Sequence, residues 1–460
     1  MKSLIGDKSF YKRLIAISLP IIVQQLITSS VQLVDNVMVG SLGELAIGSV
    51  SVVNQLYFVV ILVTFGVLGG AGVFTAQYFG SKDFDKLKQT YRFKVIAALV
   101  IAVLAFVVLS FFGESLISIF TDNPVTIAGG MDYLRIVKWS MLPWAMSVSI
   151  SFTFREIGIT KPLLRISLIT IVVNTLLNYL LIFGSFGFPQ LGIKGAAIAT
   201  LISRCVESGL FIILVYKKGQ VFNSKIKEIF KINRFVLKAI IIMAIPLMLN
   251  EILWSTGQTM FMEAYSTRGD NALAAANITG AISQLVFVIF GGMSTGIAVM
   301  VGNTLGENKL KLAQENSKKL IFASIVFSAF MGLILFGLSF FILNIYDVLE
   351  ETKQIAAFNI RVNALIIPVV AFNVAMYFTL RSGGDTRSTF IMDSGYMWVI
   401  QVPAAYVLSR VTDLPITMLF LIIQLLEIPK MAFAFSRYQK GHWIKNLAVA
   451  NEDNANALVG

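Results

Sequence analysis

Long apolar stretches separated by short polar connections run along almost the whole chain. A helix needs about 20 residues to cross the hydrocarbon core of a bilayer, and each of these stretches reaches that length. We therefore predict an all-α membrane protein with twelve transmembrane helices. The predicted spans are residues 14–38, 46–78, 93–112, 133–153, 163–184, 193–216, 237–262, 272–304, 320–345, 358–380, 388–409 and 414–436.

The second half of the chain repeats the first at a spacing of 226 residues. Because each half holds six predicted spans, an even number, both halves enter the membrane from the same side. We therefore predict two six-helix bundles related by a pseudo-twofold axis along the membrane normal, an architecture typical of secondary transporters. The residues that recur are Pro20 and Pro246, Ser29 and Ser255, Gln32 and Gln258, Gly43 and Gly269, Gly66 and Gly292, Gly70 and Gly296, and Gly80 and Gly306.

Basic residues gather in the connections that follow even-numbered spans, whereas the opposite connections are short or acidic. The positive-inside rule makes the basic connections cytoplasmic, so both termini should face the cytoplasm from the inner or plasma membrane. The predicted domains are an N-terminal lobe (1–216), a cytoplasmic linker (217–236), a C-terminal lobe (237–440) and a C-terminal tail (441–460). The basic linker suits the anionic headgroups of membrane lipids.

Composition agrees with a membrane protein, because 57% of the residues are hydrophobic, 13% are charged and the mean hydropathy is +0.80. The net charge of +12 comes from the cytoplasmic connections, so nucleic acid is not an expected partner. A single cysteine, Cys205, excludes an internal disulfide, and a single histidine, His442, argues against a histidine-based metal or catalytic centre. With no HExxH motif and no Ser-His pair, we predict no enzyme activity and no cofactor.

One face of the first span is polar. Gln25, Thr28, Gln32 and Asp35 recur at helical spacing and therefore lie on the same side of the helix. An ionisable side chain inside a span costs about 3 kcal/mol unless it faces a cavity or a partner. Asp35 is therefore a candidate binding residue for a cation or proton. The alternative is that Asp35 lies at the outer interface and caps the helix.

The fifth span carries a second one-sided polar row, in which Thr170, Asn174 and Asn178 follow each other at intervals of four residues. Amide groups hydrogen-bond to a carboxyl group and offer oxygen ligands to a cation. Asn174 and Asn178 are therefore further candidates for cation binding. The alternative is a purely structural role in hydrogen bonds between helices, worth about 0.6 kcal/mol each.

The copy of the first span in the second half has Phe261 in place of Asp35, but Glu251 in place of Gln25. Each half therefore keeps one acid inside its first span, at a different depth. Aromatic side chains interleave with these polar positions and attract cations, as a cavity for lipophilic cations requires. The candidates for lining the substrate cavity are Gln25, Gln32, Tyr57, Glu251, Gln258 and Tyr377.

Opposite charges stand three residues apart inside the sixth and twelfth spans, where Arg204 precedes Glu207 and Glu427 precedes Lys430. This spacing brings side chains together on a helix. We predict that both are structural ion pairs rather than substrate contacts.

Several motifs, in this order, resemble those of the multidrug and toxic compound extrusion (MATE) transporters. They are PIIVQQLITSSVQLVDNVMVG from Pro20, REIGITK from Arg155, LGIKGAAIAT from Leu191 and RSGGDTR from Arg381. The resemblance covers residues 10–440. It implies alternating access between two bundles and export of mostly cationic compounds in exchange for protons or sodium ions.

The resemblance also implies that Asp35 takes part in cation or proton binding, with Asn174 and Asn178 on the helix beside it. Sodium-coupled relatives have a glutamate in the seventh helix and an aspartate in the tenth. Glu251 fits the first position, but the tenth span here has no acid, so protons are favoured over sodium ions. The chain is expected to act as a monomer. The alternative function is a flippase for a lipid-linked saccharide, but the expected strongly basic cavity and additional spans are absent.

The predicted topology can be tested by placing single cysteines at Lys82, Lys225 and Lys309, all in predicted cytoplasmic connections, in a chain whose own Cys205 is replaced by serine. In intact cells, a membrane-impermeant thiol reagent should label none of them, whereas inverted vesicles should expose all three. Labelling of any of these sites from outside would contradict the topology.

Overall fold

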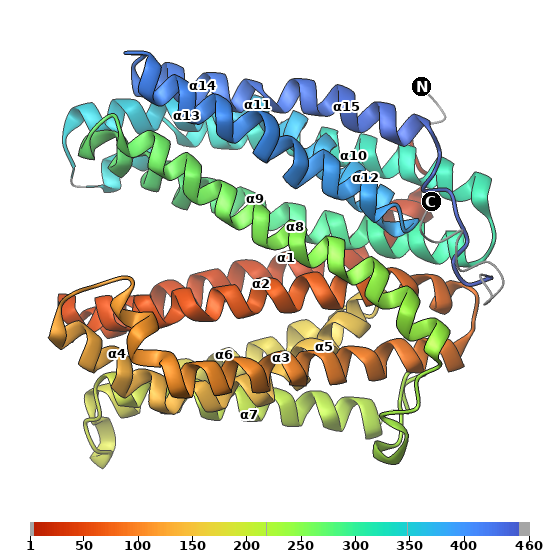
Figure 1. Cartoon of the computed structure of the whole chain (residues 1–460), viewed down its shortest axis with the longest axis horizontal. Helices are drawn as coiled ribbons and strands as arrows, with labels where there is room; N and C mark the ends of the chain where they lie inside the picture. Colours follow the sequence, from red (N-terminus) through yellow and green to blue (C-terminus); the bar gives the residue numbers. More distant parts are fainter. Residues whose placement is uncertain (1–3, 218, 347, 450–460) are drawn as a thin grey trace. The chain divides into compact units, whose positions relative to one another are not determined.

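The computed structural model describes residues 4–217, 219–346 and 348–449, and every regular element within these ranges is helical (Figure 1). The helices of the first half are α1 (Lys8–Gly40), α2 (Glu44–Gly80), α3 (Phe84–Ser118), α4 (Pro124–Val137), α5 (Met141–Glu156), α6 (Lys161–Phe183) and α7 (Ile193–Lys217). Those of the second half are α8 (Arg234–Ser266), α9 (Asp270–Gly306), α10 (Leu310–Leu338), α11 (Glu350–Ser382), α12 (Thr386–Phe390), α13 (Val402–Val411), α14 (Ile416–Leu425) and α15 (Glu427–Gln439).

Among the described residues, 10 helical stretches are long and apolar enough to cross a membrane. The predicted fourth and eleventh spans are also helical but interrupted. A 3-10 turn, η1 (Lys138–Ser140), separates α4 from α5, and two π-helical turns, η5 (Ile391–Gly395) and η6 (Met397–Gln401), separate α12 from α13. The prediction of an all-α membrane protein with twelve spans is therefore confirmed.

The duplication seen in the sequence extends to the backbone. Helices α1 and α8 both have 33 residues, start 226 positions apart and contain a proline at the matching place, Pro20 or Pro246. The turns also match, because Lys82 and Asn308 have the left-handed φ angles 62° and 60°. Such angles are uncommon for residues other than glycine. Their recurrence indicates that the two halves have the same local fold.

The chain forms two compact units. One comprises the described parts of residues 1–18, 76–82 and 249–460, and the other comprises 19–75 and 83–248. The predicted lobes 1–216 and 237–440 share most, but not all, of their residues with these units. Thus the N-terminal half of α8 belongs with the first-half helices, whereas the end of α2 belongs with the second-half helices.

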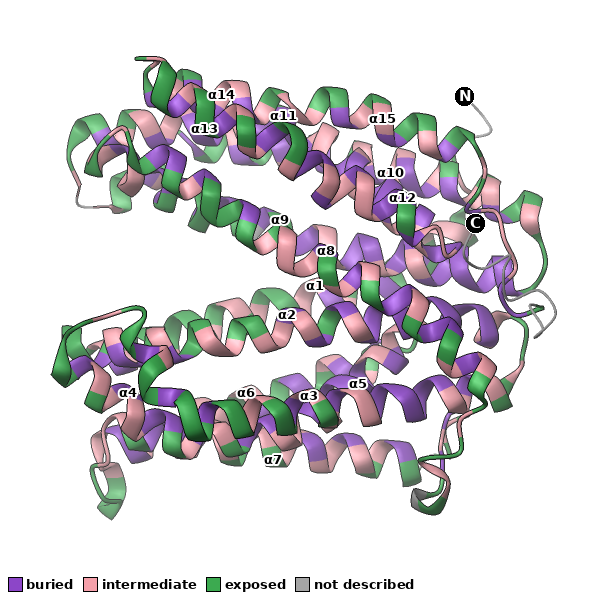
Figure 2. Cartoon of the chain, viewed as in Figure 1, coloured by how far each residue is buried: buried purple, intermediate pink, exposed green. Residues whose placement is uncertain are grey.

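Each unit has its own apolar core and also exposes many large apolar side chains. Figure 2 shows that buried and exposed positions occur along the same helices. In the unit that holds α3, Leu134 and Met141 are buried in the core, whereas Phe111 on α3 is 80% exposed. In the other unit, Leu419 is buried and Leu333 on α10 is 74% exposed. Exposed apolar side chains on long helices are the surface that lipid tails cover.

The ends of α2 and α9 approach each other closely within one unit, and glycine makes this approach possible. A Cβ atom on Gly80 would overlap the backbone carbonyl of Asn303, and a Cβ on Gly306 would overlap that of Gln77. The two contacts are related by the 226-residue spacing. Small residues allow membrane helices to pack backbone against backbone.

Replacing Gly306 by alanine should destabilise the folded protein by about 1–3 kcal/mol, because the added methyl group must displace a neighbouring helix. The matched control is Gly280→Ala in the same helix, where an added Cβ would meet nothing within 4 Å. Thermal unfolding of the purified variants followed by size-exclusion chromatography measures the difference. Equal stability of the two variants would show that the close approach at Gly306 is not required.

Candidate functional site

The first candidate site lies in the unit formed mainly by first-half helices and joins α1 to α6. The Nδ2 atom of Asn178 donates a hydrogen bond of 2.8 Å to Oδ1 of Asp35. The same amide nitrogen lies 3.4 Å from Oδ1 of Asn174, one helical turn earlier. The structure therefore brings together Asp35, Asn174 and Asn178, as the family resemblance implied. The amide nitrogen of Asn178 faces both the carboxylate and the amide oxygen of Asn174.

Asp35 has no ion pair with any described cation. Arg204, in the same unit, is bound instead to Glu207 at 2.8 Å, which confirms the ion pair predicted within the sixth span. Asn178 is only 3% exposed, and its Oδ1 atom has no hydrogen-bond partner among the described residues. The site thus offers carboxylate and amide oxygens that could accept a proton or hold a small cation.

The other first-half candidates are not gathered around Asp35 by hydrogen bonds in the described structure. Gln25 and Gln32 lie on the exposed side of α1, and the hydroxyl group of Tyr57 on α2 is buried. Gln24, the neighbour of Gln25, is instead engaged, because its Nε2 donates to Oγ of Ser167 on α6 at 2.6 Å. Sequence analysis missed this second link between α1 and α6.

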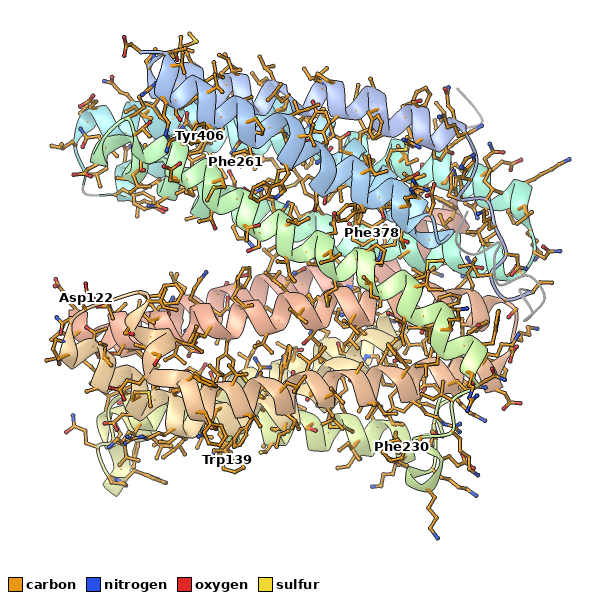
Figure 3. All side chains as sticks on the ribbon, in the orientation of Figure 1. Asp122, Trp139, Phe230, Phe261, Phe378 and Tyr406 are labelled. Carbon is orange, nitrogen blue, oxygen red and sulfur yellow. The ribbon has the colours of Figure 1, made fainter. Side chains whose placement is uncertain are left out.

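The second candidate site is a cavity of about 640 Å³ within the unit formed mainly by second-half helices. Glu251, Gln258 and Tyr377 all line it, so three predicted substrate-cavity residues share one space. Apolar side chains complete the wall, among them Phe261 and Phe378, which are labelled in Figure 3. A cavity of this size, mostly apolar with a few polar groups, is typical of sites for small molecules.

A charged network that the sequence analysis did not identify lines the same cavity. The ammonium group of Lys430 on α15 lies 2.9 Å from Oδ1 of Asp393 and 3.8 Å from Oε1 of Glu427. The predicted pairing of Glu427 with Lys430 is therefore confirmed, but Asp393 is the nearer partner. The exposed fractions of the three side chains are 8%, 20% and 15% in the order Lys430, Asp393 and Glu427.

Amide side chains hold both carboxylates of this network. Asn250 on α8 donates to Oδ2 of Asp393 at 3.1 Å. Asn373 on α11 donates to Oε2 of Glu427 at 2.8 Å, and Gln401 donates to Oε1 of Glu427 at 2.9 Å. Charge-assisted hydrogen bonds of this kind are stronger than those between neutral groups, so the carboxylates are well fixed.

The repeat explains why Asp393 was overlooked. Its counterpart in the first half is Ser167, and the counterpart of Asn250 is Gln24, so the contact between α8 and the eleventh span repeats the contact between Gln24 and Ser167. A comparison of the two halves therefore gives no sign of an acid at this place. The available signal was simpler, because an acid within an apolar span is itself a candidate functional residue.

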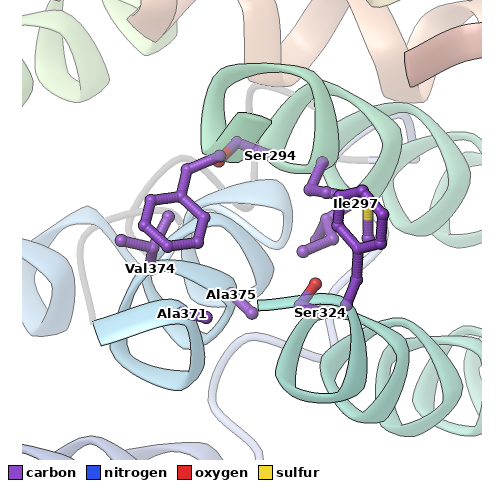
Figure 4. A pocket seen from close by; sticks show the side chains of 9 residues that line it. Ser294, Ile297, Ser324, Ala371, Val374 and Ala375 are labelled. Carbon is purple, nitrogen blue, oxygen red and sulfur yellow. The ribbon is translucent and has the colours of Figure 1, made fainter. Parts of the chain in front are cut away.

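A smaller crevice of about 10 Å³ lies between α9, α10 and α11 (Figure 4). Its wall is apolar apart from the hydroxyl groups of Ser294 and Ser324. This volume is about that of one water molecule, so the crevice is a packing gap rather than a site for a substrate.

Comparison with known proteins connects the chain to a family. The MatE family model matches residues 20–180 and again residues 246–407, once in each half of the chain. The chain is 25% identical over 402 residues to a probable multidrug resistance protein NorM of Thermotoga maritima, covering 87% of this chain and 86% of the relative. It is also 25% identical over 402 residues to the multidrug resistance protein MdtK of Pectobacterium atrosepticum, covering 86% of this chain and 87% of the relative.

Solved structures show the same fold. The crystal structure of a mutant of the Vibrio cholerae MATE transporter VcmN superposes with a TM-score of 0.88 at 19% identity, covering 98% of this chain and 100% of the other. An outward-facing multidrug resistance MATE family transporter superposes with a TM-score of 0.85 at 18% identity, covering 95% and 98%.

Proposed function

Because the chain belongs to the MatE family, we propose that it is a cation-coupled multidrug antiporter that exports lipophilic, mostly cationic compounds by alternating access. The names of its relatives as multidrug resistance proteins support efflux of small molecules. We place this activity in the inner or plasma membrane, with both termini cytoplasmic, and assign it to the monomer.

The observation that carries this proposal is the state of Asp35. Its carboxylate accepts a hydrogen bond from Asn178 at 2.8 Å but has no cationic partner among the described residues. A negative charge within a membrane span is costly unless something neutralises it. A proton, a sodium ion or a cationic substrate would each do so, and each could therefore shift the equilibrium between two conformations.

Protons are the proposed coupling ion, with sodium as the second choice. Around Asp35 the described polar partners are amides, so a single proton neutralises the carboxylate without competition from a second acid. In the other half, α11 carries no acid along its apolar part, and the acids Asp393 and Glu427 already contact Lys430. The charge balance thus favours Asp35 as the residue that responds to the ion gradient.

The cavity beside Glu251 suits a lipophilic cation. Glu251 forms no hydrogen bond with another described side chain, and its carboxylate shares the cavity with Trp254, Phe287 and Phe378. Aromatic rings attract cations through their negative faces, and a carboxylate adds a full charge. A lipid-linked saccharide carries phosphate, which the carboxylate of Glu251 would repel. Lys430, the cation that lines this cavity, already contacts Asp393 and Glu427, so the flippase alternative is less well supported.

Asp35→Asn imitates the protonated carboxyl group and should abolish gradient-driven efflux while leaving a folded, membrane-inserted protein. Glu251→Gln should cause a smaller or substrate-dependent loss, because it alters one wall of a large cavity. The measurement is efflux of a fluorescent lipophilic cation from proteoliposomes, with a pH gradient and a sodium gradient imposed separately. Glu44→Gln, an exposed acid at the start of α2, is the control.

Three results would contradict parts of the proposal. Full activity of Asp35→Asn would remove Asp35 from the mechanism. Strict dependence of the wild-type protein on sodium, with no response to pH, would exclude protons as the coupling ion. Failure of the wild-type protein to transport any of a panel of organic cations would argue against the proposed substrate class.

Asn178→Ala should reduce efflux about tenfold, because loss of a hydrogen bond to a charged group corresponds to about 1.5 kcal/mol. Asn174→Ala should have a smaller effect, since its amide contacts Asn178 at 3.4 Å rather than the carboxylate. Thr175→Ala on the same helix serves as the control, and expression should remain near normal in all three. Wild-type efflux in Asn178→Ala would assign this residue to helix packing alone.

A further inference from the structure

The network around Lys430 contains more oxygen atoms than the ammonium group contacts. Asn373 and Gln401 hold Glu427 through their amide nitrogens, and each side chain is 3% exposed. The amide oxygen of each, Oδ1 of Asn373 and Oε1 of Gln401, is buried and has no hydrogen-bond partner among the described residues. Buried acceptors without a partner are rare, because each costs desolvation energy.

The arrangement therefore resembles a binding shell for a cation. Two carboxylates supply charge, and the two amide side chains that hold one of them each keep an oxygen without a described partner. Small hard cations prefer oxygen ligands of these kinds. All four side chains line the cavity of about 640 Å³, so the shell is in contact with space that a solute can reach.

The repeated half shows that the acids are an addition to the common scaffold. The position of Lys430 is occupied by Arg204 there, whereas Ser167 and Leu201 stand in place of Asp393 and Glu427. Arg204 obtains its own counter-ion from Glu207 on the same helix at 2.8 Å. Both halves thus carry a cation at this place, but only the second half surrounds it with two acids from different helical elements.

We propose that Asp393 and Glu427 form a site for a monovalent cation, in which the side chain of Lys430 is the resident cation. Lysine is suited to this role because its ammonium is a compact charge on a flexible stem. A free cation, either a sodium ion or the ammonium group of a ligand, enters the site only when the side chain of Lys430 leaves it. The ammonium of Lys430 then balances the charge of one of these two carboxylates at any sodium concentration, independently of the exchange at Asp35.

The test uses the purified full chain carrying Lys430→Gln and does not require transport, so it remains informative if the proposed efflux activity fails. Removal of the ammonium leaves two carboxylates without a cation, and a sodium ion that binds only the folded protein stabilises it. Thermal unfolding is measured over a series of NaCl concentrations, with choline chloride added to hold the ionic strength constant. The sodium concentration of half-maximal stabilisation should fall at least about tenfold relative to wild type.

Three controls separate a specific site from a general loss of charge. Arg204→Gln removes the repeat-related cation but leaves one acid rather than two, and should show the wild-type response to sodium. Lys430→Arg keeps a resident cation and should also show the wild-type response to sodium. The double variant Asp393→Asn/Lys430→Gln removes one carboxylate and should lose the gain in sodium response seen in Lys430→Gln.

The outcome is decisive even if Lys430→Gln folds poorly. Recovery of folded protein in NaCl but not in choline chloride would support the proposal. If Lys430→Gln is folded but sodium stabilises it no more than it stabilises the wild type, the proposal is wrong. The proposal is also wrong if Lys430→Gln is unfolded in both salts while Asp393→Asn/Lys430→Gln is folded. An equal gain in Arg204→Gln would also overturn it, because the effect would then not depend on Asp393 and Glu427.

Discussion

A charge inside a lipid bilayer must be balanced by the protein, and this constraint governs how the polar residues of this chain are arranged. The free energy of an isolated charge in a span is unfavourable by about 3 kcal/mol even on the mildest scales. The two halves meet the constraint differently. Lys430 contacts Asp393 and Glu427, and amides fix both acids, whereas Asp35 accepts one hydrogen bond from Asn178 and lacks a described cationic partner.

We propose that this difference gives the two halves different roles. A compensated network keeps its charge when ion concentrations change, so it favours one stable arrangement of its helices. An acid without a counter-ion responds to whatever cation is available, and its helix contacts can change with it. The duplication makes the contrast clear, because α1 and α8 have equal lengths and equivalent prolines while Asp35 is matched by Phe261.

Much of the fold could be predicted from the sequence because the thickness of the bilayer fixes the minimum length of a spanning helix. Apolar stretches of about 20 residues identified the spans, and the recurrence of Pro20 as Pro246 identified the duplication. The interruption at η1 had a signal in the sequence that the prediction of an unbroken span did not use, because Pro143 lacks the amide hydrogen that would bond to the carbonyl of Trp139 within Lys138–Ser140. The close approach at Gly306 depends on which helix lies opposite, although the glycine itself was recognised as part of the repeat.

The candidate sites were predictable to different degrees. Asp35, Asn174 and Asn178 could be grouped because spacing places each row on one face of its helix, and the resemblance suggested that those faces meet. Asp393 and Gln401 could not be grouped with Glu427, because they lie eight residues apart on an irregular span whose geometry the sequence does not reveal. Hydrogen bonds across helices, such as that from Gln24 to Ser167, also require knowledge of the tertiary structure.

The π-helical turns η5 and η6 have a consequence for this network. A π turn carries one more residue than an α turn, and such turns are frequent at functional sites. Asp393 lies in η5 and Gln401 in η6, so both belong to a stretch wound more loosely than its neighbours α12 and α13. Rewinding this stretch by a single backbone hydrogen bond would rotate both side chains about the helix axis while the span stayed helical. The span therefore contains a torsional adjustment through which the surroundings of Lys430 can be altered without breaking a membrane helix.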